Sequence, residues 1–312
     1  MQIVLPGALP DPREARELSS YLIKTAPTLV QWLAKSRSAE LDADPIKAAC
    51  TPYEQWLLRS RGFAPAEGQK LSAGLGPLWA APATVAANQP VWLVELVHIS
   101  PSRNGAALLK ADDLSITPEQ SVALFQSAQS LFEGTGFALS GMSPGRWRVE
   151  IPANFTPTCA SPTLVSLSLV NDWWTQDVAG RPWRQLVNEL QMLWFTHPVN
   201  QARQAQGLAP VNSLWLFGGA TPGQLKSELQ PGVSQIHTSL LGPAQAHDWN
   251  GWINALAELE VKVFQPWAQH RPAPRLVLTG ARKIVELAPG SGWKRWLPGN
   301  RNEWRKWWSP QD

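Results

Sequence analysis

The sequence has little cysteine, little charge and no long apolar run. Its 312 residues include two cysteines, Cys50 and Cys159, too few for a disulfide framework. Two such residues fit a reducing compartment, where each thiol behaves as a small apolar group. No stretch approaches the ~20 apolar residues that a membrane-spanning helix needs. The N-terminal residues lack a basic segment followed by an apolar one, so we expect no signal peptide and a cytoplasmic protein.

Charged residues make up only 16% of the chain, against 44% hydrophobic residues. This composition is typical of a well-packed globular protein, long enough for one large domain or two smaller lobes. The net charge of +3 is unevenly distributed, because residues 271–312 carry nine Lys or Arg against three Asp or Glu. The sequence therefore indicates a mildly acidic body with a basic end.

Three segments carry the signals of a helix start, with a capping residue followed by proline and then by Glu or Gln at the third helical position. They begin at Asp11, Thr51 and Thr117. An apolar stripe at helical spacing predicts a further helix over 181–200. A proline ends that helix, and a short second helix is expected up to Gly207.

Strand patterns recur along the chain. Residues 91–99 and 213–217 are continuous apolar runs, which are typical of strands buried on both faces, whereas 146–151 alternates like a half-solvated edge. Residues 163–170 are a fourth candidate, and 275–278 with 284–287 form a predicted hairpin. The pattern predicts an α/β protein with a mixed, largely buried β-sheet flanked by helices.

The segment "IPANFTPTCASP" at 151–162 contains three prolines and is the best candidate for a seam between lobes. We therefore expect an N-terminal α/β lobe over residues 1–152 and a C-terminal lobe with a basic tail over 163–312. Fourteen of the 18 tryptophans lie from Trp147 onward, so the second half is Trp-rich. Large rigid side chains are expected to do most of the packing or binding there.

Polar residues gather where the stretch "NELQMLWFTHPVNQARQ" leads into the apolar run at 213–217. Arginine and amide side chains suit oxyanions such as phosphate or carboxylate, and the layout predicts polar groups near the carboxyl end of a buried strand. The alternative is a structural His-Pro corner with asparagines bonding backbone ends, which we favour for the histidine taken alone. The candidate ligand-binding residues are His197, Asn200, Arg203, Asn212, Gly218 and Gly219.

Residues from about 50 to 220 resemble the RpfE-type regulatory proteins of proteobacteria. The segments that carry the resemblance are "CTPYEQWLL", "GLGPLWA", "VNDWW", "RPWRQLVNELQMLWFTHPVNQAR" and "NSLWLFGGA". The family name implies regulation of pathogenicity factors. The resemblance thus implies a non-catalytic regulatory or binding protein, with an unknown protein partner or a small anionic ligand and with no cofactor.

A narrower segment, from His197 to Gly218, is similar to the archaeal-type cofactor-independent phosphoglycerate mutases. It implies the alternative, an enzyme acting on a phosphorylated metabolite. Those mutases need a nucleophilic serine near an early Asp-Gly segment and later Asp/His clusters that bind two metals. The first fifty residues contain no Asp-Gly pair, and the carboxylate–histidine group after residue 219 is only "AHD" at 246–248. We therefore expect no mutase activity and no metal site.

The tail "GWKRWLPGNRNEWRKWWSPQD" interleaves basic and aromatic residues. Such a pattern suits single-stranded nucleic acid, because bases stack on indoles while cations follow phosphates, and it also suits an anionic membrane surface. The helical spacing of the last tryptophans equally predicts a terminal helix docked on the body, which is the interpretation we favour. The candidate contact residues are Arg301, Trp304, Arg305, Trp307 and Trp308.

Overall fold

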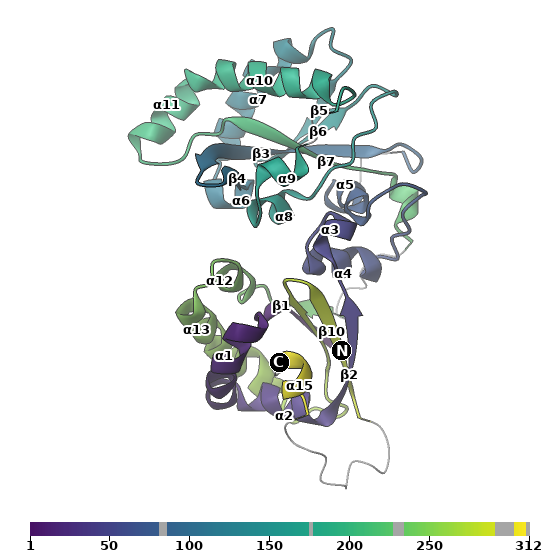
Figure 1. Cartoon of the computed structure of the whole chain (residues 1–312), viewed down its shortest axis with the longest axis vertical. Helices are drawn as coiled ribbons and strands as arrows, with labels where there is room; N and C mark the ends of the chain where they lie inside the picture. The colour runs from purple at the N-terminus through teal and green to yellow at the C-terminus, as the bar shows by residue number, and fades with distance from the viewer. Residues whose placement is uncertain (81–85, 175–176, 227–233, 291–302, 310–312) are drawn as a thin grey trace. The chain divides into compact units, whose positions relative to one another are not determined.

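The computed structural model describes residues 1–80, 86–174, 177–226, 234–290 and 303–309. Its elements are labelled in Figure 1. The protein is an α/β protein with two five-stranded sheets flanked by helices, so the predicted class is confirmed. Within the described part of the chain, no helix is both long and apolar enough to cross a membrane.

The chain divides into two compact units. Unit 1 comprises residues 1–45, 51–56 and 228–312, and unit 2 comprises 46–50 and 57–227. This division differs from the expected lobes, since the proline-rich segment at 151–162 lies inside unit 2. Both ends of the chain belong to unit 1 because they supply strands of one sheet, and no local sequence signal marks such long-range pairing.

Unit 1 contains a mixed sheet of order β2-β10-β9-β1-β8. Its interior strand β1 runs parallel to both β8 and β9, with Gln2 opposite Ser234 on one side and Arg275 on the other. The predicted hairpin is confirmed as β9 and β10. The strands are β1 (Gln2–Leu9), β2 (Ser36–Asp42), β8 (Ser234–Ile236), β9 (Arg275–Gly280) and β10 (Lys283–Pro289).

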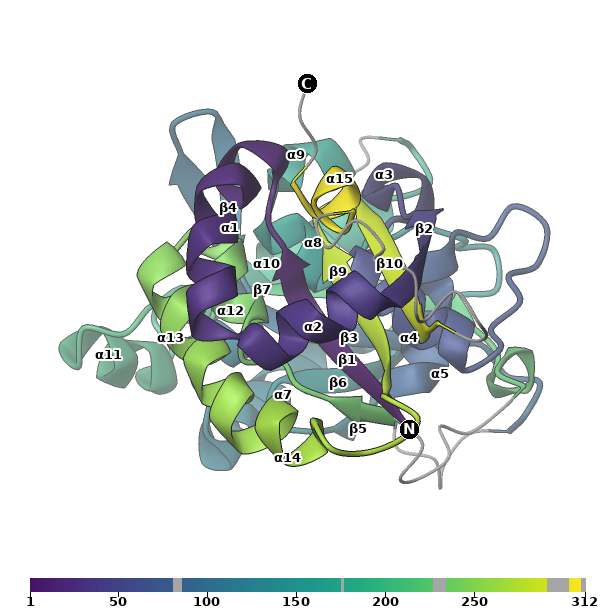
Figure 2. The same cartoon turned by 90° about the horizontal axis from the view of Figure 1, so that it is seen from below.

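Helices α1, α2 and α13 lie over one face of this sheet (Figure 2). Leu5 of β1 packs in the same apolar core as Leu22 and Leu256, which come from two of these helices. The helical elements of unit 1 are α1 (Pro12–Thr25), α2 (Pro27–Lys35), α12 (Leu241–Gln245), α13 (Trp249–Leu259), the π-helix η4 (Glu260–Phe264), α14 (Gln265–Trp267) and α15 (Arg305–Trp308).

Unit 2 contains an antiparallel sheet organised around β3. Strand β3 pairs with β6 and β7 along its first half and with β4 along its second half. Strand β6 lies between β3 and β5, so the predicted edge position of 146–151 is wrong although its side chains do alternate in burial. The strands are β3 (Val91–Ser102), β4 (Gly105–Leu109), β5 (Ala138–Met142), β6 (Arg146–Glu150) and β7 (Ser213–Ala220).

Helices cover both faces of the unit 2 sheet, with α7 and α10 on one face and α8 and α9 on the other (Figure 1). The predicted helix 181–200 is confirmed as α10 followed by α11. The helices lying wholly or partly in unit 2 are α3 (Pro45–Ala48), α4 (Pro52–Ser60), η1 (Leu71–Gly74), α5 (Leu75–Trp79), α6 (Ala111–Leu114), α7 (Pro118–Phe132), α8 (Pro162–Ser166), α9 (Val170–Trp173), α10 (Arg181–Phe195), α11 (Pro198–Ala205) and η3 (Pro222–Gln224).

The three predicted helix starts are confirmed as the starts of α1, α4 and α7. At Thr117 both bonds of the capping box are present, and Thr51 exchanges the equivalent bonds with Glu54. Asp11 occupies the capping position of α1 without a side-chain bond to the helix.

The predicted strand at 163–170 is wrong, because this segment forms α8 and the start of α9. The hydroxyl of Ser161 accepts the Leu164 N–H at 3.1 Å, and Pro162 takes the first helical position. A capping serine followed by proline is a helix-start signal. Here it outweighs an apolar run that is too short to distinguish strand from helix.

Candidate functional site

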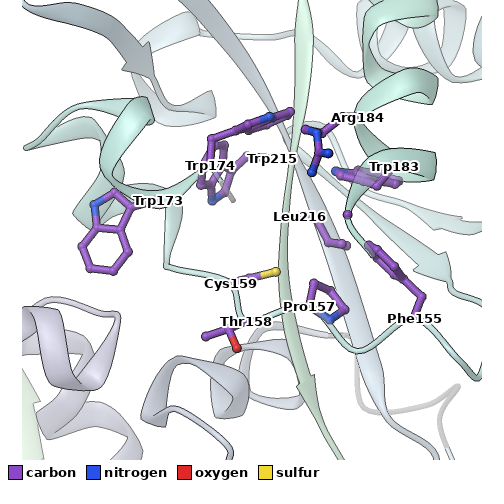
Figure 3. Close-up of a pocket in the computed structure, with 11 residues that line it drawn as sticks. Phe155, Pro157, Thr158, Cys159, Trp173, Trp174, Trp183, Arg184, Trp215 and Leu216 are labelled. Carbon is purple, nitrogen blue, oxygen red and sulfur yellow. The ribbon is translucent and has the colours of Figure 1, made fainter. Parts of the chain in front are cut away.

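An aromatic pocket opens in unit 2 beside β7 (Figure 3). It encloses ≈ 430 Å³ of space, a volume that includes its open mouth. Its side chains come from the segment after β6, the end of α9, the start of α10 and β7 itself. The lining residues are Phe155, Pro157, Thr158, Cys159, Trp173, Trp174, Gly180, Trp183, Arg184, Trp215 and Leu216.

The floor of the pocket wraps around the edge of β7. Trp215 and Leu216 are neighbours on this strand, so their side chains point to opposite faces of the sheet, yet both line the pocket. Within the described part of the chain, β7 pairs with β3 alone. The other edge of β7 is therefore where the pocket forms.

Two indole N–H groups of the pocket are bonded inside the protein. Trp215 donates to the backbone carbonyl of Ala160 at 2.9 Å, and Trp173 donates to the Ser168 hydroxyl at 2.9 Å. Trp174 packs on Trp215 with ring centroids 5.5 Å apart. With their polar edges so engaged, Trp173 and Trp215 offer the pocket mainly carbon surface.

The start of α10 supplies the charge of the pocket. Among the described residues that line it, Arg184 is the only charged one. Its Nη2 donates to the backbone carbonyl of Asp177 at 2.7 Å, and its Nη1 lies 3.7 Å from the Asp177 carboxylate. That carboxylate accepts the Gly180 N–H at 2.6 Å. An arginine on an otherwise apolar, aromatic wall suits an anionic group.

Cys159 places its sulfur in the pocket (Figure 3). Burial raises the pKa of this thiol to about 12, so it is protonated and neutral near pH 7. A protonated thiol is a poor nucleophile, because thiolates carry out that chemistry. Cys159 therefore adds neutral surface and leaves Arg184 as the source of charge.

Four of the residues predicted for ligand contact lie together, at the amino end of β7. Asn200 is 1% exposed, and its amide group donates to the backbone carbonyls of Trp194 and Val211 and accepts the Val211 N–H. Asn212 exchanges two bonds of 2.8 Å with the backbone of Ile99. Both asparagines thus bond to backbone groups, as the alternative interpretation of a structural role predicted.

Arg203 is also 1% exposed. Its guanidinium donates to the carbonyls of Ala209 and Leu114 and to the Gln120 side chain, at 2.6–2.8 Å. Burial lowers the pKa of this arginine. The bonds to Leu114 and Gln120 join α11 to α6 and α7, and the bond to Ala209 holds the segment after α11, so the side chain is engaged in holding the fold.

His197 caps α11 by accepting the Val199 N–H at 3.2 Å on Nδ1, and burial lowers its pKa. Gly218 and Gly219 lie near the far end of β7 from these residues. Gly218 is six positions along the strand from Asn212, about 20 Å at ~3.3 Å per residue. The expectation that these polar groups lie near the carboxyl end of a buried strand is therefore wrong, because they precede β7 whereas the glycines lie near its end.

Close packing explains why glycine stands at both positions. Gly218 and Gly219 have φ of +104° and +106°, a conformation that favours glycine. A Cβ on Gly218 would lie 2.5 Å from the Val91 carbonyl oxygen, and one on Gly219 would lie 2.4 Å from the Trp92 ring. A ligand-binding role for these residues and the four polar ones stays a prediction.

The C-terminal tryptophans are docked in the unit 1 core, as we favoured. Trp304, Trp307 and Trp308 are all buried within the same apolar cluster as β1 and α13. Their indoles are consequently not exposed as a stacking surface for nucleic acid or membrane. Arg305 lies over the Trp304 ring at 5.7 Å, and Arg301 lies outside the described residues.

The "AHD" group serves local structure. Asp248 caps α13 by accepting the Gly251 N–H at 2.9 Å, and the His247 ring packs edge-on against Trp249. Across the described ranges of the chain, no three His, Cys, Asp or Glu side chains are grouped so that they could hold a metal ion.

The sequence did not predict the pocket, because its residues come from four segments and other structural roles were assigned to them. The segment at 151–162 was interpreted as a seam, and Trp183 as one member of an apolar helix stripe. The pair Trp173-Trp174 was a usable signal, since two adjacent indoles cannot both enter one helix face.

The chain matches no known protein family and no curated protein. In structure it is similar to a cofactor-independent phosphoglycerate mutase from Thermoplasma acidophilum DSM 1728, with 13% identity and a TM-score of 0.35 over 93% of this chain and 89% of that one. It is also similar to the PH0037 protein from Pyrococcus horikoshii, with 14% identity and a TM-score of 0.47 over 93% and 87%. None of these comparisons shows membership of the RpfE family. Function has to be argued from the site itself.

Proposed function

We propose that the protein is a non-catalytic regulatory or binding protein whose aromatic pocket takes a small anionic ligand with a flat apolar body. The observation that carries this proposal is the convergence of four tryptophans around one cavity with Arg184 as the charged lining side chain. A mostly apolar cavity with a few placed polar groups is the usual form of a small-molecule site.

The apolar body of the ligand would lie against indole surface. Trp174 and Trp173 are half-buried, and Trp183 and Trp215 form deeper walls. Rings prefer offset or edge-on contact with indoles, and such contact adds to the free energy gained by burying carbon surface. These walls favour a planar molecule over a branched aliphatic one.

The anionic group would lie beside Arg184. Its side chain is 18% exposed, so a charge brought next to it is less screened than on the open surface. A guanidinium presents a planar set of donors that matches a carboxylate. The sequence analysis offered Arg203 as the arginine that contacts an oxyanion, and this proposal gives that role to Arg184 instead.

The test is a fluorescence titration of the full chain with 8-anilinonaphthalene-1-sulfonate, an aromatic anion. We expect saturable binding of one probe per chain, and about tenfold weaker binding by Trp174→Ala, equivalent to ~1.4 kcal/mol. Trp267→Ala is the matched control, because Trp267 is a half-buried tryptophan in unit 1. Binding that Trp174→Ala leaves unchanged would contradict the proposal.

The alternative inferred from the sequence, an enzyme acting on a phosphorylated metabolite, has its own assay. The purified chain would be incubated with 2- or 3-phosphoglycerate, with Mn²⁺ or Mg²⁺ added, and the other isomer measured. Interconversion that depends on the added metal would replace the non-catalytic proposal with the enzymatic one.

A further inference from the structure

We propose that Asp177 is an internal competitor for the ligand of the aromatic pocket, and that the ligand is a planar aromatic monocarboxylate whose charge replaces the Asp177 carboxylate beside Arg184. This inference rests on the proposed function of the pocket and adds the ligand class and the residue that sets its charge preference.

The carboxylate of Asp177 occupies a position at the pocket wall without belonging to the lining. It accepts the Gly180 N–H at 2.6 Å and lies 3.7 Å from Nη1 of Arg184. Gly180 and Arg184 line the pocket, whereas Asp177 does not. The Asp177 carboxylate therefore approaches the Gly180 N–H and the Arg184 guanidinium from outside the pocket, and an anion inside the pocket would contact the same two groups.

The two contacts between Asp177 and Arg184 differ in strength. The backbone carbonyl of Asp177 accepts a hydrogen bond of 2.7 Å from Nη2, which holds the guanidinium in place. The carboxylate, at 3.7 Å, is beyond hydrogen-bond distance, and its side chain is 59% exposed. A pair this open is weakened by solvent, so a ligand carboxylate can compete for Arg184 while the Asp177 carbonyl still positions the guanidinium.

An incoming carboxylate has an advantage that Asp177 lacks. Burial of the ligand's ring among the indoles offsets the cost of association and brings its charge to Arg184, whereas the exposed Asp177 side chain gains no such burial. One arginine balances one negative charge. A monoanion therefore fits this wall better than a dianionic phosphate, which would need a second cation.

A cationic ligand is disfavoured by the same geometry. Trp-rich cages often bind quaternary ammonium groups through the indole faces. Here the guanidinium of Arg184 lies among the indoles of the pocket (Figure 3), and it would repel a second positive charge in partly desolvated surroundings.

The test uses three probes with one ring system and different charges: 2-naphthoate, neutral 2-naphthamide and the 2-naphthyl-trimethylammonium cation. Their affinities for the full chain are measured by calorimetry. We expect 2-naphthoate to bind about tenfold more tightly than the amide, and the cation to bind most weakly. Equal affinities, or a preference for the cation, would contradict the inference.

Asp177→Asn removes the competing charge but keeps an oxygen that can accept the Gly180 N–H. It should tighten 2-naphthoate about threefold and leave the amide unchanged. Asp177→Ser is a second variant that also keeps an acceptor. Asp172→Asn, at an exposed acid of α9, is the control for general loss of negative charge. Arg184→Gln should abolish the preference for the anion while the amide still binds.

The outcomes separate the two proposals. If none of the three probes binds the wild-type chain, the proposed function of the pocket fails. If they bind and Trp174→Ala weakens them, but both Asp177 variants leave 2-naphthoate unchanged, the pocket stands and the role of Asp177 is wrong. Thermal melts of each variant show that affinity is compared between folded proteins.

Discussion

The indole N–H of Trp308 donates a hydrogen bond of 3.0 Å to the backbone carbonyl of Ala8, joining the last described helix to the first strand. Lys283 of β10 makes a further bond to the backbone carbonyl of Trp307. The short helix α15 is thus fastened to two strands of the same sheet, and its tryptophans complete the core of unit 1.

Replacing Trp308 with alanine should lower the free energy of unfolding by ~3–5 kcal/mol, a large part of the stability of an ordinary domain. The side chain is 2% exposed, so the change leaves a cavity and removes the bond to Ala8. Thermal or urea unfolding measures the effect. Lys306→Ala, at an exposed position of the same helix, is the control and should change stability by less than about 0.5 kcal/mol.

An unchanged unfolding midpoint for Trp308→Ala, combined with lost binding to single-stranded DNA or anionic vesicles, would favour the surface interpretation of the tail. In that case binding by the wild-type chain should also fall steeply with added salt. Because all three indoles are buried, we expect neither this pattern for Trp308→Ala nor salt-dependent binding by the wild-type chain.

Arg203→Met should destabilise the protein by ~3–5 kcal/mol, because it leaves the carbonyls of Ala209 and Leu114 without their buried donors. Urea unfolding measures this loss. Gln204→Ala, at an exposed position on α11, is the control. Affinity of the remaining folded protein for 8-anilinonaphthalene-1-sulfonate should not change, since Arg203 is absent from the pocket lining. Loss of affinity without loss of stability would support Arg203 as a ligand-binding residue.

Acidification should destabilise the protein in part through His98. Burial lowers the pKa of His98 from its usual 6.5, and this outweighs the Pro210 carbonyl, 2.9 Å from Nδ1, which favours protonation. The unfolded chain then binds a proton more readily than the folded protein does. The stabilising effect is therefore present above pH 6.5 and is lost as the pH falls through the lowered pKa.

Unfolding in urea at several pH values between about 5 and 8 checks this expectation. His98→Gln, which does not titrate, should show a shallower loss of stability on acidification than the wild-type chain. His197 and His237 also have pKa values lowered by burial, so some pH dependence should remain. An identical slope in variant and wild type would show that His98 does not contribute.

The sequence predicted those elements whose signals are local. The capping box at Thr117 and the apolar stripe of α10 each lie within one helix, and both are confirmed. Strand β1 was missed because Pro6 and Gly7 interrupt its pattern, although β8 pairs with it as far as Val4 and β9 as far as Pro6 and again at Leu9. Proline is unusual in a central strand, and here the register shifts beyond it.

The pocket could not be predicted from the sequence because it depends on how distant segments meet. Nothing near Pro157 indicates that it faces Trp183, since one lies in a proline-rich segment and the other on a helix. Polar residues that stood out in the sequence, such as Asn200, proved to bond to backbone. Buried amides must find partners, so a prominent asparagine is as much a sign of an irregular connection as of a ligand.

The position of β1 between β8 and β9 has a consequence for synthesis of the protein. Gln2 is synthesised 232 residues before Ser234, its neighbour on β8. At about 10 residues per second, this apolar strand waits ~20 s for its nearest partner while all of unit 2 is made. During that time β1 is an unpaired strand with both edges open, the form that aggregates most readily. A nascent chain of this protein therefore offers chaperones the unpaired strand β1 until β8 and β9 have been made.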